Sequence, residues 1–549
     1  MIMITKSIKQ KLGAGRSAFY ACLLCCGVSV VLTACADWNE HYEAPASQAG
    51  SEPTLWQAIQ QRPELSDFGE VLSKTMIYKH HKKTSVSYAN LLDGAQTFTL
   101  LAPVNGSFNK DSVLSLLATN SGDSMVERSF VGNHLSYRLT TNSADPVEFF
   151  LLNSKRATLG NNLVLDVPVK EANVKAKGGI MHVLQNTLPY RHNLYEATLN
   201  DPRYSLIGNQ LGSYEFDEFD PNKSVEGGMV DGEQIYVDSV FNERNLLLDY
   251  VGRLADEDSS YIFLVPTADE WQRVWEEAMS YFRYDATVEG GDSLQRFWAN
   301  YALLNDAIFS RTINKKPTDS LVTYGYDSRY PQYHVFRRPF EEGGILYGAT
   351  SAEYSNGTLF TTSHWPYTPQ TTYQRELKIE GERTGLILEN TYSTYTTRIH
   401  AADSVSENEY LVITPANINS NWTLTYKLEN TLAGCYDIYA VILPATVYDP
   451  TALVKPCQFQ AVVNYVDEKG VAQSFDCNKT RFNNDPTRVD TLLLAENFTF
   501  PVCNYDQTNM KFTLTLKCNI AARDSKNYSR EMFLDCIYLR PKNKMTTEQ

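Results

Sequence analysis

The chain contains 549 residues, with 49 Lys and Arg against 64 Asp and Glu, which gives a formal net charge of −15 at pH 7. So acidic a chain repels the phosphate backbone, and nucleic acid is therefore excluded as a partner. At roughly 150 residues per domain, the length predicts about three domains.

The first 34 residues have the order of a secretory signal peptide. Basic side chains lie between Lys6 and Arg16, and a short apolar stretch follows from Ala18 to Leu32. This stretch is too short and too interrupted to span a bilayer comfortably. We therefore expect residues 1–34 to be removed during export.

The residues that end this stretch, Leu32-Thr33-Ala34-Cys35, resemble a bacterial lipobox. In a lipobox the cysteine receives a diacylglyceryl group and becomes the first residue of the mature protein. Asp37 and Glu40 follow directly, which resembles the surface-export signal of lipoproteins in glycan-foraging Gram-negative bacteria. The resemblance implies a lipid at Cys35 and an outer-membrane, cell-surface location. Residues 35–51 are polar and rich in Ala, Ser, Pro and Gly, as is typical of a tether.

Three motifs follow in the next part of the chain. Apolar residues recur at helical spacing from Leu55. TFTLLAPVNGSF (97–108), NHLSY (133–137) and GGIMHVLQNTLP (178–189) then occur in this order. Their order and separation resemble a fasciclin domain, which implies a compact α+β fold over residues 52–195. The resemblance also implies that His134 and His182 form internal hydrogen bonds, and a lone histidine without a partner nucleophile is more often structural than catalytic.

A weaker second copy of this pattern covers residues 196–375. In SYIFLVPTADEWQRVW (260–275), Pro266 stands five residues before Trp271, as Pro103 stands five before Phe108. YSNGTLFTTSHWPY (354–367) resembles the closing motif of the first copy. Internal duplication is the simplest explanation. We therefore expect a degenerate second fasciclin-like domain, interrupted by the loop YGYDSRYPQYHVF.

From about Lys378 the chain alternates apolar and polar residues over many segments, with almost no helical period. DEKG (467–470) has the composition of a hairpin turn. This pattern predicts a β-sandwich over residues 376–549 and resembles jelly-roll carbohydrate-binding modules, although no binding residue is carried over. The whole chain is thus expected to be α+β, with two fasciclin-like domains followed by an all-β sandwich.

The C-terminal region also holds every cysteine that follows Cys35. These six residues are Cys435, Cys457, Cys477, Cys503, Cys518 and Cys536. They are consistent with disulfides, which the compartment permits, and equally with buried free thiols. The sequence does not choose between these alternatives.

Signatures of the common enzyme classes are missing from the sequence. It contains no GxSxG elbow, HExxH helix, GxxxxGK[ST] loop or GxGxxG turn after a strand. The acidic run at 215–228 lacks the glycine and the bidentate glutamate of a calcium loop, which favours a solvated acidic loop. We therefore expect no catalytic residue, no metal site and no cofactor.

Aromatic residues in two places are candidate contacts for a glycan or a protein partner. Sugars bind on exposed aromatic planes flanked by polar side chains. The inserted loop and the stretch after Asn419-Ser420-Asn421 provide such residues: Tyr324, Tyr326, Arg329, Tyr330, Tyr333 and Trp422. The alternative is that each of these aromatics packs against its own domain.

Two functions are consistent with this sequence. The first is a non-catalytic cell-surface lipoprotein that binds polysaccharide or assists a glycan-uptake complex, which consists of a TonB-dependent transporter and its glycan-binding lipoprotein. The second is a fasciclin-type adhesin that mediates cell–cell or matrix contact without glycan capture. Neighbouring transporter and glycosidase genes would favour the first function.

The first prediction concerns the anchor. Replacing Cys35 by Ala removes the sulfur that would carry the lipid, so Cys35→Ala should accumulate as an unprocessed or soluble precursor. Metabolic labelling with a fatty acid, followed by membrane fractionation, measures this. Cys26→Ala, which changes a cysteine inside the signal peptide, is the matched control and should remain labelled. Labelling that persists in Cys35→Ala contradicts the prediction.

Overall fold

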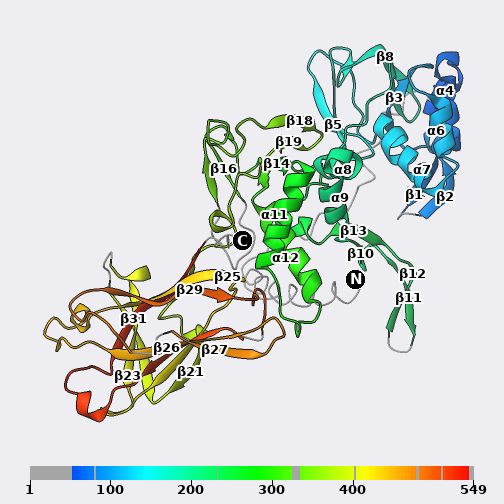
Figure 1. Ribbon diagram of the computed structural model, residues 1–549. Coiled ribbons are helices and arrows are strands. Elements are labelled where there is room, and N and C mark those ends of the chain that lie inside the picture. Colours follow the sequence, from blue (N-terminus) through cyan, green and yellow to red (C-terminus); the bar gives the residue numbers. More distant parts are fainter. Residues whose placement is uncertain are drawn as a thin grey trace, which may run out of the picture. The chain divides into compact units, whose positions relative to one another are not determined.

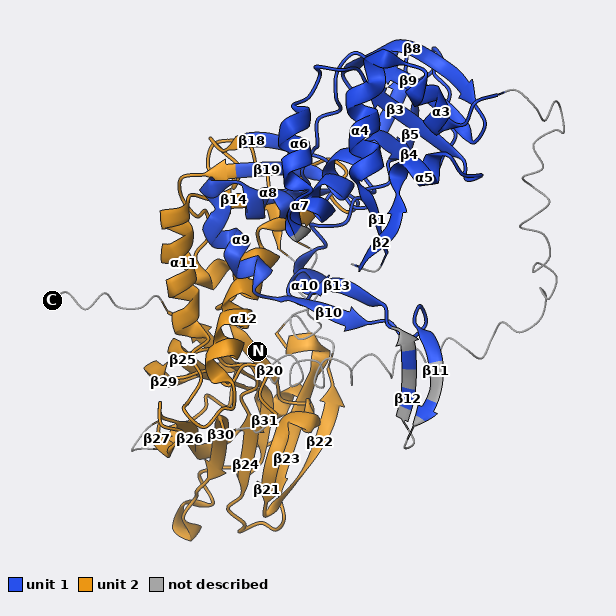
Figure 2. Cartoon of the chain, turned by 90° about the vertical axis from the view of Figure 1, so that its right-hand side faces the viewer, with its two compact units in different colours: residues 1–263, 310–312, 351–360 blue, residues 264–309, 313–350, 361–549 orange. Residues whose placement is uncertain are grey.

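The computed structural model describes residues 52–79, 82–230, 233–323, 334–400, 404–477, 481–508 and 511–542. The predicted signal peptide, the tether and Cys35 lie outside these residues. The chain divides into two compact units, drawn in two colours in Figure 2. Unit 1 comprises residues 1–263, 310–312 and 351–360, and unit 2 comprises residues 264–309, 313–350 and 361–549. Helices and strands are both abundant, as the predicted α+β class requires.

A seven-stranded sheet with the order β4-β3-β9-β8-β7-β6-β5 lies in unit 1 (Figure 1). The pair β3 and β9 is parallel, and the other pairs are antiparallel. The strands are β3 (Phe98–Pro103), β4 (Leu135–Ser136), β5 (Val147–Phe150), β6 (Arg156–Gly160), β7 (Leu163–Val164), β8 (Val167–Ala176) and β9 (Gly179–Leu184). The TFTLLAPVNGSF and GGIMHVLQNTLP motifs therefore provide the parallel pair, β3 and β9, which holds the second and third positions of the sheet.

Helices pack against this sheet through a core that includes the fully buried Phe68, Leu72 and Phe98. They are α3 (Leu55–Gln60), α4 (Ser66–Lys74), α5 (Tyr88–Leu92), α6 (Lys110–Leu116) and α7 (Asn120–Met125), with one π-helical segment, η2 (Val126–Val131), and a hairpin of β1 (Met76–Lys79) and β2 (Lys82–Ser87). The helical spacing after Leu55 is divided between α3 and α4 because Pro63 begins a 3-10 turn and has no N–H for a continuous helix.

The two motif histidines form internal hydrogen bonds, which confirms their predicted structural role. His134 Nδ1 lies 2.7 Å from the carbonyl oxygen of Phe130, and its Nε2 accepts from the N–H of Leu188 at 3.0 Å. His182 Nε2 lies 3.0 Å from the carbonyl oxygen of Thr140, and its Nδ1 accepts from the N–H of Asn173 at 3.3 Å. His134 therefore links the π-helical segment η2 to the segment after β9, and His182 links the segment at Thr140 to β8.

The rest of unit 1 contains short helices and two hairpins (Figure 1). The helices are α8 (Leu194–Asn200), α9 (Ser205–Gly212) and α10 (Leu248–Val251). The hairpin strands are β10 (Glu215–Phe219) with β13 (Phe241–Asn245), and β11 (Val225–Val230) with β12 (Glu233–Asp238). The acidic run at 215–228, expected as a solvated loop, instead comprises β10, a turn and the start of β11, and the side chain of Asp220 accepts from Asn242 Nδ2 at 2.9 Å.

The second motif set has the same local construction as the first. Strand β14 (Tyr261–Pro266) neighbours β19 (Gly357–Thr362) in the sheet order β15-β14-β19-β18, as β3 neighbours β9. Gly179 and Gly357 begin the second strand of each pair at φ +144° and +156°. A Cβ at either glycine would lie about 2 Å from a carbonyl oxygen, that of Phe98 or of Tyr261. The same steric requirement at both places supports the predicted duplication.

The other elements of this region are two long helices and short strands. They are α11 (Ala268–Tyr281), α12 (Gly291–Asn305), β15 (Ile308–Ser310), β16 (Ser320–Val322), β17 (Val335–Arg337) and β18 (Thr350–Tyr354). Single 3-10 turns occur at Pro63–Leu65, Gly132–His134, Pro202–Tyr204, Pro369–Thr371, Thr384–Leu386, Ser406–Asn408, Ala445–Val447 and Ala522–Asp524.

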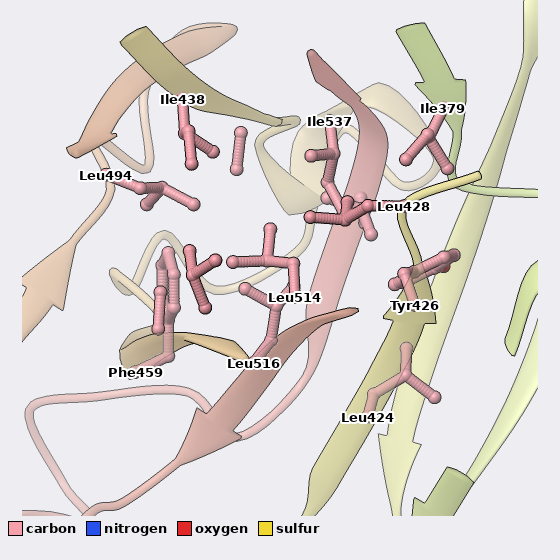
Figure 3. Close-up of a cluster of buried hydrophobic side chains, with 14 of the residues drawn as sticks. Ile379, Leu424, Tyr426, Leu428, Ile438, Phe459, Leu494, Leu514, Leu516 and Ile537 are labelled. Carbon is pink, nitrogen blue, oxygen red and sulfur yellow. The ribbon is translucent and has the colours of Figure 1, made fainter. Parts of the chain in front are cut away.

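Two antiparallel sheets in unit 2 share one hydrophobic core, so this region is a β-sandwich. One sheet has the order β22-β23-β31-β25-β29, with β20 paired to β31, and the other has the order β21-β24-β30-β26-β27, with β28 paired to β26. The strands are β20 (Leu377–Glu380), β21 (Ile387–Thr391), β22 (Ser393–Ile399), β23 (Glu409–Pro415), β24 (Thr423–Lys427), β25 (Gly434–Ile442), β26 (Gln458–Val466), β27 (Ala472–Asp476), β28 (Phe482–Asn483), β29 (Asp490–Phe500), β30 (Thr513–Cys518) and β31 (Met532–Pro541). Figure 3 shows Ile438 and Ile537 of the first sheet in the same cluster as Leu514 and Leu516 of the second.

Local features of the sandwich settle two questions that the sequence raised. The DEKG turn joins β26 to β27, with the N–H of Gly470 donating to the carbonyl oxygen of Asp467 at 2.9 Å. All six cysteines of this region are free thiols. Burial raises the pKa of Cys503 to about 12, so this thiol is a small hydrophobic side chain rather than a nucleophile. Among the described helices, none is long and apolar enough to cross a membrane.

The second prediction concerns His134, whose pKa burial lowers to about 4. In the unfolded chain the same histidine has a pKa near 6.5, so it takes up a proton at a higher pH than it does in the folded protein. The free energy of unfolding that depends on neutral His134 is therefore fully present above pH 6.5 and falls as the pH drops towards 4. The loss at pH 4 should be about 3 kcal/mol. Hydrogen exchange of the amides in β3 and β9, measured across this pH range, reports it.

His134→Gln is the matched variant, because glutamine keeps a donor and an acceptor but does not titrate in this range. The difference in protection between the two proteins should therefore shrink as the pH falls. Parallel pH profiles would show that the buried imidazole does not control the stability of this sheet.

Candidate functional site

Of the candidate contacts expected from the sequence, Trp422 alone lies among the described residues. The loop residues Tyr324, Tyr326, Arg329, Tyr330 and Tyr333 lie outside the described residues, so they remain a prediction.

The expectation for Trp422 is wrong. Its side chain is 0% exposed, and its indole N–H donates to the carbonyl oxygen of Arg530 at 2.6 Å. The residue directly precedes β24, and its ring belongs to the core between the two sheets. No ring face is available to a ligand, because packing against the opposite sheet stabilises the sandwich more than exposure would.

A cleft of about 830 Å³ in unit 1 is the candidate functional site. Three segments line most of it: the π-helical segment η2, the end of β5 with the turn that follows it, and the loop Ala255–Asp258. The π-helical segment presents two successive residues, Glu127 and Arg128, to the cleft. Such π-helical turns are rare and often occur at functional sites.

Two aromatic rings at the cleft are unusually open to solvent. Tyr137 is 63% exposed and Phe150 is 44% exposed, and both line the cleft. Their backbones are adjacent, because Ser136 Oγ donates to the carbonyl oxygen of Phe150 at 2.6 Å. Phe150 lies on β5 opposite Arg156 of β6, whose guanidinium carbon is 5.2 Å from the ring centre. Phe150 therefore stands at the end of a paired strand, and Tyr137 directly follows the last residue of β4.

Glu127 is a partly buried carboxylate that lines the same cleft. Burial raises its pKa, although Tyr88 Oη donates to Glu127 Oε1 at 2.5 Å and opposes that rise. The same burial and hydrogen bond raise the pKa of Tyr88 well above its ordinary value, so the phenol remains a donor at neutral pH. A carboxylate in this state accepts hydrogen bonds strongly from a ligand that displaces the remaining water.

A buried ammonium group beneath the cleft joins its walls. Lys155 is 4% exposed at its side chain, and its Nζ lies 2.8 Å from Glu196 Oε2 and 2.5 Å from Glu257 Oε1. Burial alone would raise the pKa of Glu196, but hydrogen bonds from Lys155 and Tyr190 outweigh it and lower the pKa. Arg128 Nη2 also donates to Glu196 Oε1 at 2.8 Å. The ionised carboxylate of Glu196 thus accepts hydrogen bonds from three side chains, those of Lys155, Tyr190 and Arg128.

Glu257 completes this network from the loop that follows α10. Its Oε1 accepts from Lys155, from Ser355 Oγ at 3.0 Å and from Asn193 Nδ2 at 3.2 Å. Asn193 caps helix α8, and Glu196 at the third helical position accepts from the N–H of Asn193 at 3.0 Å. A capping box therefore fixes the position of Glu196, which binds Lys155, and of Asn193, which donates to Glu257.

The NHLSY motif positions one polar residue of the cleft. Asn133 is 3% exposed, and its Oδ1 accepts from Asn153 Nδ2 at 3.0 Å. Asn133 Nδ2 donates to the carbonyl oxygen of Leu188 at 3.2 Å. The motif residue beside His134 therefore holds Asn153, which lines the cleft, against the segment after β9.

The sequence did not reveal this cleft, because its walls come from segments that are distant in the chain. Tyr137 was noticed only as part of the NHLSY motif, and Phe150, Glu127 and Glu257 carried no signal of their own. Strand alternation would not have found Tyr137, because it places this residue on the same face as Leu135, which is fully buried. Within the described part of the chain, no cluster of three or more His, Cys, Asp or Glu side chains is arranged to hold a metal ion.

No family model and no curated protein matches the chain. Among solved structures, the FAS1 domain pair of the insect cell adhesion molecule fasciclin I is similar at 11% identity over 50% of this chain and 90% of that one, with a TM-score of 0.19. A family 22 carbohydrate-binding module of Clostridium thermocellum Xyn10B is 9% identical over 30% of this chain and 91% of its own, and a family 35 module from the same organism is 10% identical over 31% and 99%; both have TM-scores of 0.19. Values this low do not establish a shared fold.

The third prediction tests the buried network. Lys155→Met leaves two buried carboxylates without their shared cation, and breaking such a pair should cost about 3–5 kcal/mol. Urea unfolding, combined with hydrogen exchange of residues 147–160 and 193–200, measures the loss. Adding Glu257→Gln to Lys155→Met removes one stranded charge and should restore part of the stability.

Lys74→Met is the matched control, because the pair of Lys74 with Glu70 lies at the surface and Lys74 is 54% exposed at its side chain. This variant should lose less than about 0.5 kcal/mol. Equal losses in Lys155→Met and Lys74→Met would contradict a structural role for the buried ammonium.

Proposed function

We propose that this protein is a non-catalytic, lipid-anchored cell-surface protein that binds glycan in the cleft of unit 1. The observation that carries the proposal is the pair of exposed rings, Tyr137 after β4 and Phe150 at the end of β5, beside hydrogen-bonding groups in one cleft. A sugar ring has an apolar CH face and a rim of hydroxyl groups, so it needs an aromatic plane with polar neighbours. This cleft offers both.

The surrounding polar groups support binding rather than catalysis. Asn153 and Arg128 provide donors, Glu127 provides acceptor oxygens, and each is held by a second side chain. Preorganised groups of this kind gain affinity because they lose little entropy when a ligand arrives. The fasciclin-like motifs, the lipobox-like sequence at Cys35 and the jelly-roll-like strand pattern favour a surface protein that assists a TonB-dependent transporter and its glycan-binding lipoprotein.

The fourth prediction is that each exposed ring contributes to glycan binding. Tyr137→Ala and Phe150→Ala should each weaken binding to a polysaccharide roughly ten-fold, about 1.4 kcal/mol, because stacking area is lost. The melting temperature should change little, since exposed side chains add little to stability. Affinity electrophoresis in gels that contain one neutral polysaccharide each, followed by calorimetry, measures both quantities.

Tyr347→Ala is the matched control, because Tyr347 is 54% exposed and lies in unit 2. It should bind as the unchanged protein does. If Tyr137→Ala and Phe150→Ala both retain full binding, the cleft is not the glycan site. If cells that carry the unchanged protein adhere to one another and no polysaccharide is retained, the adhesin function replaces this proposal.

A further inference from the structure

The charged groups at the cleft are almost all carboxylates. Among its lining residues, the acidic side chains are Glu127, Glu243, Asp256, Glu257 and Asp258, and the one cationic side chain is Arg128. Arg128 donates to Glu196, and Arg253 Nη1 lies 3.7 Å from Asp256 Oδ2, so the charges of Arg128 and Asp256 are each partly neutralised before any ligand arrives. The field inside the cleft is therefore negative, and low-dielectric walls strengthen such a field.

The buried side chain of Glu257 is a second, independent indication of negative potential at the cleft. Its side chain is 5% exposed, and all of its described donors, Lys155, Ser355 and Asn193, reach Oε1. Among the described residues, Oε2 has no hydrogen-bond partner. A buried carboxylate oxygen without a donor is costly, and it leaves negative potential at the wall of the cleft that a ligand cation would offset.

The aromatic rings favour the same charge. A cation is attracted to the face of an aromatic ring within about 6 Å of its centre. Phe150 already has such a contact, because the guanidinium carbon of Arg156 lies 5.2 Å from its ring centre. Arg156 is paired with Glu148 at 2.9 Å, so it adds no net charge to this edge. The ring of Tyr137 is open to a ligand cation in the same way.

We propose that the cleft selects glycans that carry free ammonium groups, that is, unacetylated amino sugars, and rejects glycans that carry carboxylate or sulfate. This inference rests on the proposed function, since it names the class of glycan for the same site. The sugar rings stack on Tyr137 and Phe150, and the ammonium groups face Asp256 and Asp258 on the loop after α10. A neutral sugar contacts only the two rings, whereas an acidic sugar is repelled by the carboxylates of Asp256 and Asp258.

The fifth prediction concerns the affinity of the same full-length protein for three probes. Binding is measured in mildly acidic buffer, where the amines are protonated. The probes are a glucosamine oligosaccharide, its fully N-acetylated form and an oligogalacturonate of equal length. The amino form should bind roughly ten-fold more tightly than the acetylated form at low salt. Added salt should reduce this preference, because it screens exposed charges, and the oligogalacturonate should bind most weakly.

Asp256→Asn combined with Asp258→Asn should reduce the preference for the amino form to within about three-fold while binding of the acetylated form is kept. Glu341→Gln combined with Glu342→Gln removes the same charge from two exposed neighbours in unit 2, and it should keep the full preference. This control separates a charge effect of the cleft from the net charge of the chain.

The outcomes distinguish this inference from the proposed function. If all three probes depend on Tyr137 but the amino form has no advantage, glycan binding stands and the selection for ammonium is wrong. If Tyr137→Ala changes the binding of none of the probes, both are wrong. A lysine-rich peptide that binds more tightly than every oligosaccharide, and that loses binding in Tyr137→Ala, replaces the glycan by a protein ligand.

Discussion

The cleft depends on the buried ammonium of Lys155. This group contacts Glu196 at the start of α8, Glu257 in the loop after α10 and Ser355 between β18 and β19, while Lys155 itself lies between β5 and β6. An uncompensated charge in such a place costs several kcal/mol, so all of these segments must lie within hydrogen-bond distance of one atom. A buried ion pair adds little net stability compared with an apolar core, and its effect here is to fix geometry. Phe150 at the end of β5 and the carboxylates of Asp256, Glu257 and Asp258 stand on segments that this atom joins or directly follow them.

Local sequence patterns were sufficient to predict the framework. The TFTLLAPVNGSF and GGIMHVLQNTLP motifs contain the strands of the parallel pair β3 and β9, and the internal hydrogen bonds that the resemblance implied for His134 and His182 are confirmed. The strand motifs are recognisable because they depend on neighbouring residues or on a steric requirement at one residue. Gly179 illustrates this, because a Cβ there would overlap the carbonyl oxygen of Phe98. Such requirements leave a direct trace in the sequence.

The cleft and the orientation of single aromatics leave no such trace. Glu127, Asn153 and Glu257 meet only because three segments fold together, and nothing in the residues near each of them shows the others. Trp422 shows the opposite error: polar neighbours at Asn419, Ser420 and Asn421 indicated an exposed ring, but Asn421 Oδ1 accepts from the N–H of Ile520 and the indole enters the core. Exposure of an aromatic is decided by which side of the backbone faces the opposite sheet, and composition does not encode that choice.

Structure and recognition are divided between different residues in unit 1. His134, His182 and Gly179 are tied to backbone atoms of the central sheet and its loops, and none of them lines the cleft. Asp256 and Asp258 lie on a loop, where substitutions disturb packing least. Between these two sets stand Asn133 and Asn153, through which the buried motif holds a cleft residue in place. Changes in the loop can therefore alter the charge that a ligand meets while Tyr137, Phe150 and the framework that holds them stay the same.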